Sequence, residues 1–223
     1  MNKTIAIIPA RGNSKRLPGK NIKMLNDLPL IAYSIKYALN NRDVVSDVYV
    51  STDDSNIKQV ALQFGAKVID RPSHLSGDLE PTVSVLKHAL EVIKEDIDTV
   101  VLLQVTNPLR PNELLKEALN IFNETNSESL FTVSRDYKKL GKIIAKKFQP
   151  YNYKIGQRSQ DLDPLYYENG LLYITKASLI KEDIIFNELS LPFVVNHKFA
   201  EIDIDTQEDF DYTEYILNNN NAE

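Results

Sequence analysis

The sequence has 223 residues, of which 43% are hydrophobic and none is cysteine, and its formal net charge at pH 7 is −5. A chain of this length can bury one full core, and without cysteine it has neither disulfides nor thiolate metal sites. It has no long apolar run, no signal-peptide pattern at its start and no basic stripe beyond residues 11–23, so we expect a cytoplasmic protein that binds neither membrane nor nucleic acid.

Strand and helix patterns alternate along the first two thirds of the chain. Short apolar runs, typical of buried strands, are each followed by a segment with apolar residues at helical spacing. This alternation predicts an α/β fold in which a mostly parallel sheet is covered by helices on both faces. The predicted strands are residues 4–9, 46–51, 67–70 and 99–104, and the predicted helices are residues 30–39, 52–64, 80–94 and 111–122.

The pattern changes after residue 127, where strands are joined by long polar connections. Residues 149–169 are rich in Tyr, Gln, Asp and Pro. We therefore expect a single domain over residues 1–223 with an insertion, or arm, at about residues 135–170. The tail from residue 218 is expected to fray. The remaining predicted strands are residues 129–134, 142–148, 170–175, 193–196 and 201–205, and the last predicted helix is residues 206–217.

The first predicted strand ends in a loop that concentrates positive charge. Such loops bind ligands in α/β folds, and a cationic one is placed to receive a polyanion such as a nucleoside triphosphate. The glycine spacing fits neither a Walker loop nor a Gly-x-Gly-x-x-Gly motif, so side chains must supply much of the binding. A merely solvated basic loop is the alternative. Residues 11–23 carry no acidic side chain and five basic ones, namely Arg11, Lys15, Arg16, Lys20 and Lys23.

Asp203 and Asp205 are the second informative feature. Residues i and i+2 of a strand point the same way, so the two carboxylates would converge and repel each other unless a cation or proton lies between them. Mg²⁺ is typically held by one or two carboxylates together with substrate phosphates, which makes this pair a candidate metal site. The alternative is a pair of exposed acids, with Asp205 or Thr206 capping the following helix.

Polar residues also follow the predicted central strand. Gln104, Thr106 and Asn107 could orient a polyhydroxy ligand, although helix capping by Thr106 or Asn107, with a salt bridge from Arg110, would explain them as well.

Further basic residues could serve binding. Arg71 could contact a base or ribose, or pair with a nearby acid. Lys138, Lys139 and Lys142, with Arg158 nearby, could meet a carboxylate ligand, although a solvated surface is the default for such a run.

Together these residues resemble the acylneuraminate cytidylyltransferases, the CMP-sialic acid synthetase family. The segment from Ile8 to Asn21 is similar to the nucleotide-binding signature of that family. Segments around Asp53, Arg71, Gln104, Asn169 and Asp203 follow in the family's order and approximate spacing, so the resemblance covers nearly the whole chain.

The resemblance implies a Rossmann-like nucleotidyltransferase fold of the glycosyltransferase-A type, with an arm that forms a homodimer. It implies that CTP activates a nonulosonic acid, a nine-carbon 2-keto sugar acid of the sialic type, with Mg²⁺ on Asp203 and Asp205. The implied catalytic residues are Arg11, Lys20, Gln104 and Asp205. The implied CTP contacts are Ala10, Arg11, Gly12, Lys15, Lys20, Asn21, Arg71 and Thr82, and the implied sugar contacts are Thr82, Gln104, Thr106, Lys138, Lys139, Arg158, Asn169, Tyr173 and Phe193.

The sequence departs from the family pattern near the implied sugar contacts. Val105 and Asn107 replace a Pro and a Ser, and Ser159 and Tyr167 stand where the family commonly has Arg. These changes leave the CTP residues intact and leave the sugar acid open between legionaminate, a deaminated sialic acid and another nonulosonate.

The expected reaction is attack of the anomeric hydroxyl on the α-phosphorus of CTP, with release of pyrophosphate. Positioning and charge neutralisation would dominate catalysis. The alternatives are a 3-deoxy-octulosonate or other sugar nucleotidyltransferase, and a non-catalytic nucleotide-binding homologue. The hypothesis requires the basic loop and the acid pair to meet around one bound nucleotide.

Overall fold

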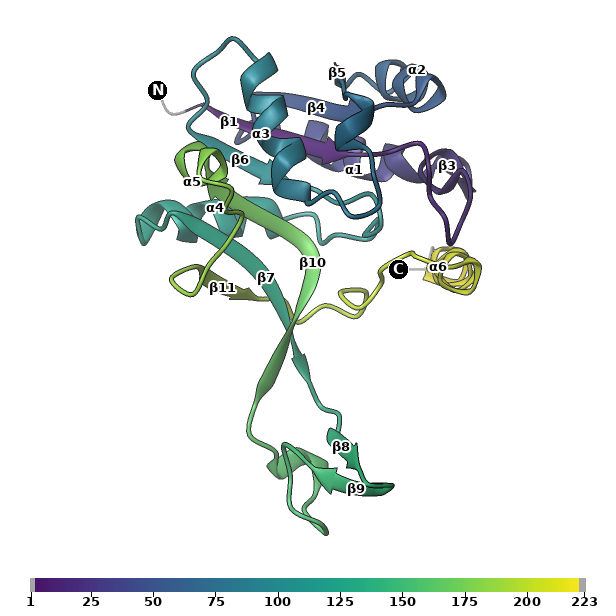
Figure 1. The fold of residues 1–223 in the computed structure, drawn as a ribbon, viewed down its shortest axis with the longest axis vertical. Helices are drawn as coiled ribbons and strands as arrows, with labels where there is room; N and C mark the ends of the chain where they lie inside the picture. The colour runs from purple at the N-terminus through teal and green to yellow at the C-terminus, as the bar shows by residue number, and fades with distance from the viewer. Residues whose placement is uncertain (1–2, 221–223) are drawn as a thin grey trace.

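A seven-stranded sheet runs through the computed structural model, which describes residues 3–220 (Figure 1). Its strands stand in the order β11 (Leu191–Val194), β7 (Ser129–Asp136), β10 (Leu165–Lys176), β6 (Thr99–Leu102), β1 (Thr4–Pro9), β4 (Asp47–Thr52) and β5 (Lys67–Asp70). β1 is parallel to β4 and β6, β4 to β5, and β7 to β11, whereas β10 is antiparallel to both of its neighbours. The predicted mostly parallel sheet is thus confirmed.

Helices cover both faces of this sheet because strand side chains alternate between two apolar clusters. Ala6 and Ile8 of β1 pack into the larger cluster with α1, α2, α4 and α6, whereas Ile5 and Ile7 pack into the smaller one with α3 and α5. Within residues 3–220 no helix is long and apolar enough to cross a bilayer. The helices are α1 (Leu30–Asn40), α2 (Ser55–Gln63), α3 (Thr82–Val92), α4 (Leu114–Glu124), α5 (Ala177–Lys181) and α6 (Gln207–Asn220).

The prediction of a strand at residues 201–205 is wrong, although its side-chain alternation is right. Ile202 and Ile204 are buried in the larger cluster, and Asp203 and Asp205 face away from it. The Ile204 N–H donates to the Thr106 carbonyl, but no ladder of hydrogen bonds to a neighbouring strand forms. The segment is therefore an extended loop that leads into α6.

The polar insertion forms an arm, which we define as residues 137–164, between β7 and β10. The two strands twist together away from the sheet and carry the arm at their end (Figure 1). The single strand predicted at residues 142–148 is wrong. It is a hairpin of β8 (Gly141–Ile144) and β9 (Lys147–Pro150), because the chain turns with positive φ at Ala145 and Lys146, where sequences that form such turns usually have Asn or Gly.

Smaller differences lie at the ends of elements. A short antiparallel pair, β2 (Met24–Leu25) and β3 (Leu28–Pro29), was not predicted. α6 continues to Asn220, so the frayed tail predicted from residue 218 is wrong up to that point, and residues 221–223 lie outside the described part of the chain.

Arg110 ties three elements together beneath the carboxyl end of the sheet. Its buried guanidinium donates to the Leu171 carbonyl (2.6 Å), the Ser34 hydroxyl (3.0 Å) and the Gln104 carbonyl (2.5 Å). Burial lowers the pKa of Arg110 to about 10. The salt bridge that the alternative explanation required of Arg110 is absent among residues 3–220; this arginine binds backbone and hydroxyl oxygens and fixes the strand end that carries Gln104.

Replacing Arg110 with Ala is expected to lower the free energy of unfolding by about 3 kcal/mol, because several buried acceptors lose their donor at once. Urea unfolding followed by circular dichroism measures the change. Arg158→Ala is the matched control, since Arg158 is exposed on the arm, where it pairs with Asp161; it should change stability by less than about 0.5 kcal/mol. Equal effects of the two substitutions would contradict the role given to Arg110.

Candidate active site

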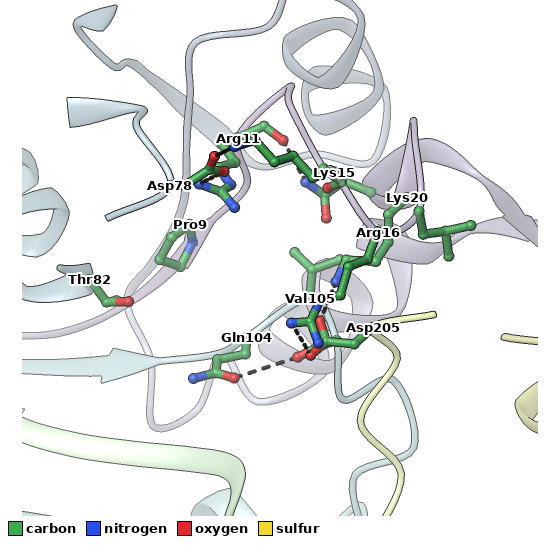
Figure 2. Close-up of a pocket in the computed structure, with 14 residues that line it drawn as sticks. Pro9, Arg11, Lys15, Arg16, Lys20, Asp78, Thr82, Gln104, Val105 and Asp205 are labelled. Atoms are coloured by element: carbon green, nitrogen blue, oxygen red, sulfur yellow. Dashed lines mark hydrogen bonds and ion pairs between the residues drawn. The ribbon is translucent and has the colours of Figure 1, made fainter. Parts of the chain in front are cut away.

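A cavity of about 540 Å³ opens where β1 and the strand end after β6 leave the sheet (Figure 2). Carboxyl ends of parallel strands are where α/β proteins bind ligands. The basic loop after β1 forms one wall, and the Gln104 segment and Asp205 form another. The lining residues are Pro9, Arg11, Ser14, Lys15, Arg16, Leu17, Lys20, Asn21, Asp78, Thr82, Gln104, Val105, Thr106 and Asp205.

Lys20 brings the basic loop into direct contact with the acid pair. Its ammonium group donates to one oxygen of Asp205 at 2.9 Å and to the Ile204 carbonyl at 2.8 Å, and only 11% of the side chain is exposed. Arg16 donates to the other Asp205 oxygen at 2.7 Å. The two features that the sequence hypothesis needs in one place therefore share a single ion-pair cluster.

A second cluster lies across the cavity and is centred on Asp78 (Figure 2). The Arg11 guanidinium lies 3.0 Å from the Asp78 carboxylate and donates to the Gly77 carbonyl at 2.9 Å, and Lys15 pairs with the same carboxylate. The hydrogen bond from Lys15 and the charge of Arg11 lower the pKa of Asp78. In this structure carboxylates thus hold the cations that a polyphosphate would need.

Asp203 lies next to these groups and is short of positive charge. Partial burial is the main cause that raises its pKa, and the charges of Asp205 and Asp209 add to it, while Thr106 and Lys20 oppose the shift. A cation bound beside Asp203 would oppose this shift, because an opposite charge favours the ionised carboxylate.

The cap of α6 bears on whether Asp205 serves as a helix cap or is available as a metal ligand. The Thr206 hydroxyl accepts from the Asp209 N–H, and the Asp209 carboxylate accepts from the Thr206 N–H, which is a capping box. Asp205 is therefore not needed as the cap, and its carboxylate faces the cavity. Within residues 3–220 no cluster of three or more His, Cys, Asp or Glu side chains could hold a metal alone, so a cation here would need ligand oxygens as well.

The Gln104 segment does not cap a helix, since α4 begins only at Leu114. Thr106 lines the cavity, whereas Asn107 is buried and donates to the Ile202 carbonyl at 2.9 Å and to the Asn169 carbonyl at 3.3 Å. Asn107 therefore holds the segment that carries Asp203 against the central strand. This positioning role could not be read from the sequence, because its partners lie 62 and 95 residues away.

A second cavity of about 430 Å³ adjoins the first and shares Thr82 and Gln104 with it. Its lining has no basic side chain, and the Tyr173 hydroxyl there donates to Glu168. Phe186 forms part of an apolar wall and stacks on Phe131 at a centroid distance of 4.6 Å. Glu168 and Phe186 were not predicted as site residues from the sequence. Its other lining residues are Pro81, Val83, Leu102, Asp183, Ile184, Ile185 and Asn187.

Gly170 allows β10 to pass close to the junction of the two cavities. Its φ is +72°, and a Cβ there would lie 3.3 Å from the side-chain oxygens of both Gln104 and Asn107. Asn169 beside it is buried: its side-chain Oδ1 accepts from the Thr132 hydroxyl and its side-chain NH2 donates to the Ser134 hydroxyl. The pair therefore shapes the wall behind Gln104.

Several implied contacts lie outside both cavities. Arg71 is buried and donates to the Ser51 carbonyl, and Phe193 packs against the larger apolar cluster from β11. Gly12 donates its N–H to Asp53 behind the loop. The implied contacts that line neither cavity are Ala10, Gly12, Arg71, Lys138, Lys139, Arg158, Asn169 and Phe193, of which Lys138, Lys139 and Arg158 stand on the arm.

Comparison with known proteins identifies the family to which the chain belongs. Residues 5–222 match the sequence model of a family described as cytidylyltransferase. The chain is 35% identical to a pseudaminic acid cytidylyltransferase of Campylobacter jejuni, with 99% of both chains covered. It is 33% identical to the CMP-N,N'-diacetyllegionaminic acid synthase of Legionella pneumophila, over 96% of this chain and 95% of that protein.

Another relative and a solved structure extend the comparison. An N-acylneuraminate cytidylyltransferase of Streptococcus agalactiae is 34% identical over 93% of this chain and 52% of its own length. A CMP:2-keto-3-deoxy-manno-octonic acid synthetase complexed with CTP superposes with a TM-score of 0.75 over 98% of this chain and 99% of that one. At 18% identity that similarity establishes the fold alone.

Replacing Asp78 with Asn should tighten binding of a nucleoside triphosphate about fivefold, because Arg11 and Lys15 would no longer have to leave a carboxylate. Partly exposed ion pairs are worth about 1 kcal/mol or less, which sets this size. Isothermal titration with CTP measures the affinity. Asp161→Asn, which removes an equal charge on the arm, is the control. Weaker binding by the Asp78 variant would show that this carboxylate assists the ligand.

Proposed function

Because the chain belongs to the cytidylyltransferase family, we propose that it transfers the cytidylyl group of CTP to a nonulosonic acid, giving a CMP-sugar and pyrophosphate. The observation that carries this proposal is the contact of Lys20 and Arg16 with Asp205. It supports a single site in which cations and carboxylates surround one nucleotide.

CTP would occupy the first cavity, with its phosphates among the basic side chains of the loop. A triphosphate would replace Asp78 as the partner of Arg11 and Lys15 and would come within reach of Lys20. Asn21 supports the loop from beneath, because its buried amide donates to the Arg11 carbonyl at 2.8 Å. The backbone at Arg11 is thus held before the nucleotide arrives.

The sugar acid would occupy the second cavity. Its apolar wall of Val83, Ile185 and Phe186 suits the apolar parts of the sugar substituents, and Glu168 provides a hydrogen-bond acceptor. Thr82 and Gln104 stand at the junction, where the anomeric hydroxyl and the α-phosphorus would meet.

The proposed reaction forms a bond between the anomeric oxygen and the α-phosphorus. The bond from that phosphorus to the bridging oxygen breaks, pyrophosphate leaves, and the hydroxyl proton passes to solvent. Arg11 and Lys20 would neutralise charge that builds on the phosphates, and Gln104 would orient the sugar. The protein contributes position and charge more than covalent chemistry.

Asp203 and Asp205 fit a divalent cation. Asp205 lines the cavity and is free of a capping role, and Asp203, two residues before it, has its pKa raised by desolvation and by nearby carboxylates. Mg²⁺ held there would bind phosphate oxygens and lower the pKa of the attacking hydroxyl. The remaining ligands would come from the nucleotide and water.

A homodimer belongs to the same proposal. Ile143, Phe148, Tyr151 and Ile155 on the arm are exposed, although side chains of this size are usually covered. The lysines of the arm lie outside both cavities of their own chain. An arm that packs on a second copy would cover these apolar side chains.

Relatives favour a nine-carbon acid over an octulosonate, since the named nonulosonate enzymes are 33–35% identical and the octonic acid synthetase only 18%. We therefore expect pyrophosphate release from CTP and Mg²⁺ with at least one of pseudaminic, legionaminic and N-acetylneuraminic acids. The rate with 3-deoxy-octulosonate should be about a hundredfold lower. A coupled pyrophosphate assay measures both. Tight CTP binding with no release from any nonulosonate would favour a non-catalytic protein.

Substituting Asp205 with Asn should lower turnover about a hundredfold or more, because the proposed metal loses a charged ligand. CTP should still bind within about tenfold of the wild-type affinity, since the basic loop remains. Steady-state kinetics and titration separate the two effects. Asp211→Asn is the control, because Asp211 is exposed on α6 and accepts a hydrogen bond from Gln207, away from the cavity. Normal rates of the Asp205 variant in excess Mg²⁺ would disprove the metal assignment.

A further inference from the structure

A separate cavity of about 280 Å³ lies where the arm joins the sheet, and we call it the arm-base cavity. It shares no lining residue with the two cavities described above. The end of β7, the start of β10 and the loop after β11 enclose it. Its lining residues are Ser134, Arg135, Tyr137, Tyr167, Val195, Asn196, His197, Lys198, Ala200 and Glu201.

Two buried hydrogen-bonding groups at this cavity have no partner. Among the described residues, three buried side-chain polar atoms lack one, and two of them, Arg135 Nε and the Tyr167 hydroxyl, belong to residues that line the arm-base cavity. The third, His88 Nδ1, lies on α3. Buried polar groups in native proteins are nearly always paired, so two unpaired donors at one cavity indicate a ligand or water that satisfies them.

The side chains that line the cavity indicate that the ligand is an anion. Arg135 forms no ion pair among the described residues and stands over the Tyr137 ring at 4.7 Å. The His197 Nδ1 accepts from the Phe199 N–H at 3.3 Å, which leaves its other ring nitrogen to donate. Arg135 and Lys198 are cationic and Glu201 is the one acid of the lining, so the cavity offers donors and an excess positive charge.

Glu201 does not supply the missing partner. Burial raises the pKa of Tyr167 and the nearby Glu201 carboxylate raises it further, while Ser134 lowers it; both residues lie close to the hydroxyl, but neither is placed to form a hydrogen bond with it. The phenol therefore keeps its proton and remains available as a donor to another acceptor.

We propose that the arm-base cavity binds a small oxyanion, a carboxylate or phosphate group, between Arg135, Tyr167 and His197. Its volume admits such a group, and its donors match the acceptor oxygens. The loop that closes the cavity continues directly to Asp203 and Asp205. A bound anion would therefore link the segment that carries the acid pair to β7 and β10.

Histidine signals allow a site-specific test, because the chain has only three histidines and His197 alone lines this cavity. Inorganic phosphate is titrated into the whole protein at fixed pH, and the ring resonances of His74, His88 and His197 are followed by NMR. The His197→Gln variant lacks the His197 resonance and so identifies it among the three. We expect a saturable shift of the His197 signal that His88 does not show. A parallel titration with acetate distinguishes a carboxylate source from a phosphate source.

Substitutions then test which side chains bind the anion. Arg135→Gln should raise the phosphate concentration at half-saturation about tenfold or more, and Tyr167→Phe should raise it severalfold. Arg42→Gln is the matched control, since Arg42 is exposed and lines none of the cavities described here. The proposal is overturned if neither phosphate nor acetate shifts the His197 signal, or if the Arg135 and Tyr167 variants, folded by circular dichroism, titrate like the wild type.

Discussion

The ammonium group of Lys20 connects the two ends of the chain. It lies between the Ile204 carbonyl and the Asp205 carboxylate, with most of its side chain buried. A largely buried cation needs such partners, and Asp205, which is partly exposed, supplies one of them to Lys20. The basic loop and the acid segment therefore form one site, in which the protein supplies charge of both signs before any ligand binds.

This contact depends on polar groups beneath the cavity that bind no ligand. Arg110 holds the strand end that carries Gln104, and Asn107 holds the Ile202 carbonyl one residue before Asp203. Both are buried, and both bond backbone oxygens from distant parts of the chain. The ligand-facing residues thus stand on a rigid layer of hydrogen bonds, which is what precise positioning of phosphates and a nucleophile requires.

Patterns among neighbouring residues predicted the fold and much of the candidate site. The strand at residues 4–9, the charge of the following loop and the alternation of Ile202 with Asp203 could all be read from neighbouring residues. Features set by partners far along the chain could not. Residues 201–205 form an extended loop that bonds the distant Thr106 carbonyl through the Ile204 N–H, instead of a strand of the sheet. Phe186 reaches the second cavity from a loop without a periodic pattern. The hairpin turn at Ala145 and Lys146 lacks the residues that usually mark such turns.

The distribution of charge between the two cavities orients the proposed substrate. The basic residues line the first cavity, whereas Glu168 and Asp183 line the second, and Asp183 is already paired with Lys87 at 2.9 Å. In a 2-keto sugar acid the carboxylate is attached to the anomeric carbon. A carboxylate is repelled by Glu168 and Asp183, so the acid end of the sugar would point away from the second cavity, toward the junction at Gln104, and leave the uncharged end against Phe186. The same charge separation that binds the nucleotide would thereby present the attacking hydroxyl to the α-phosphorus.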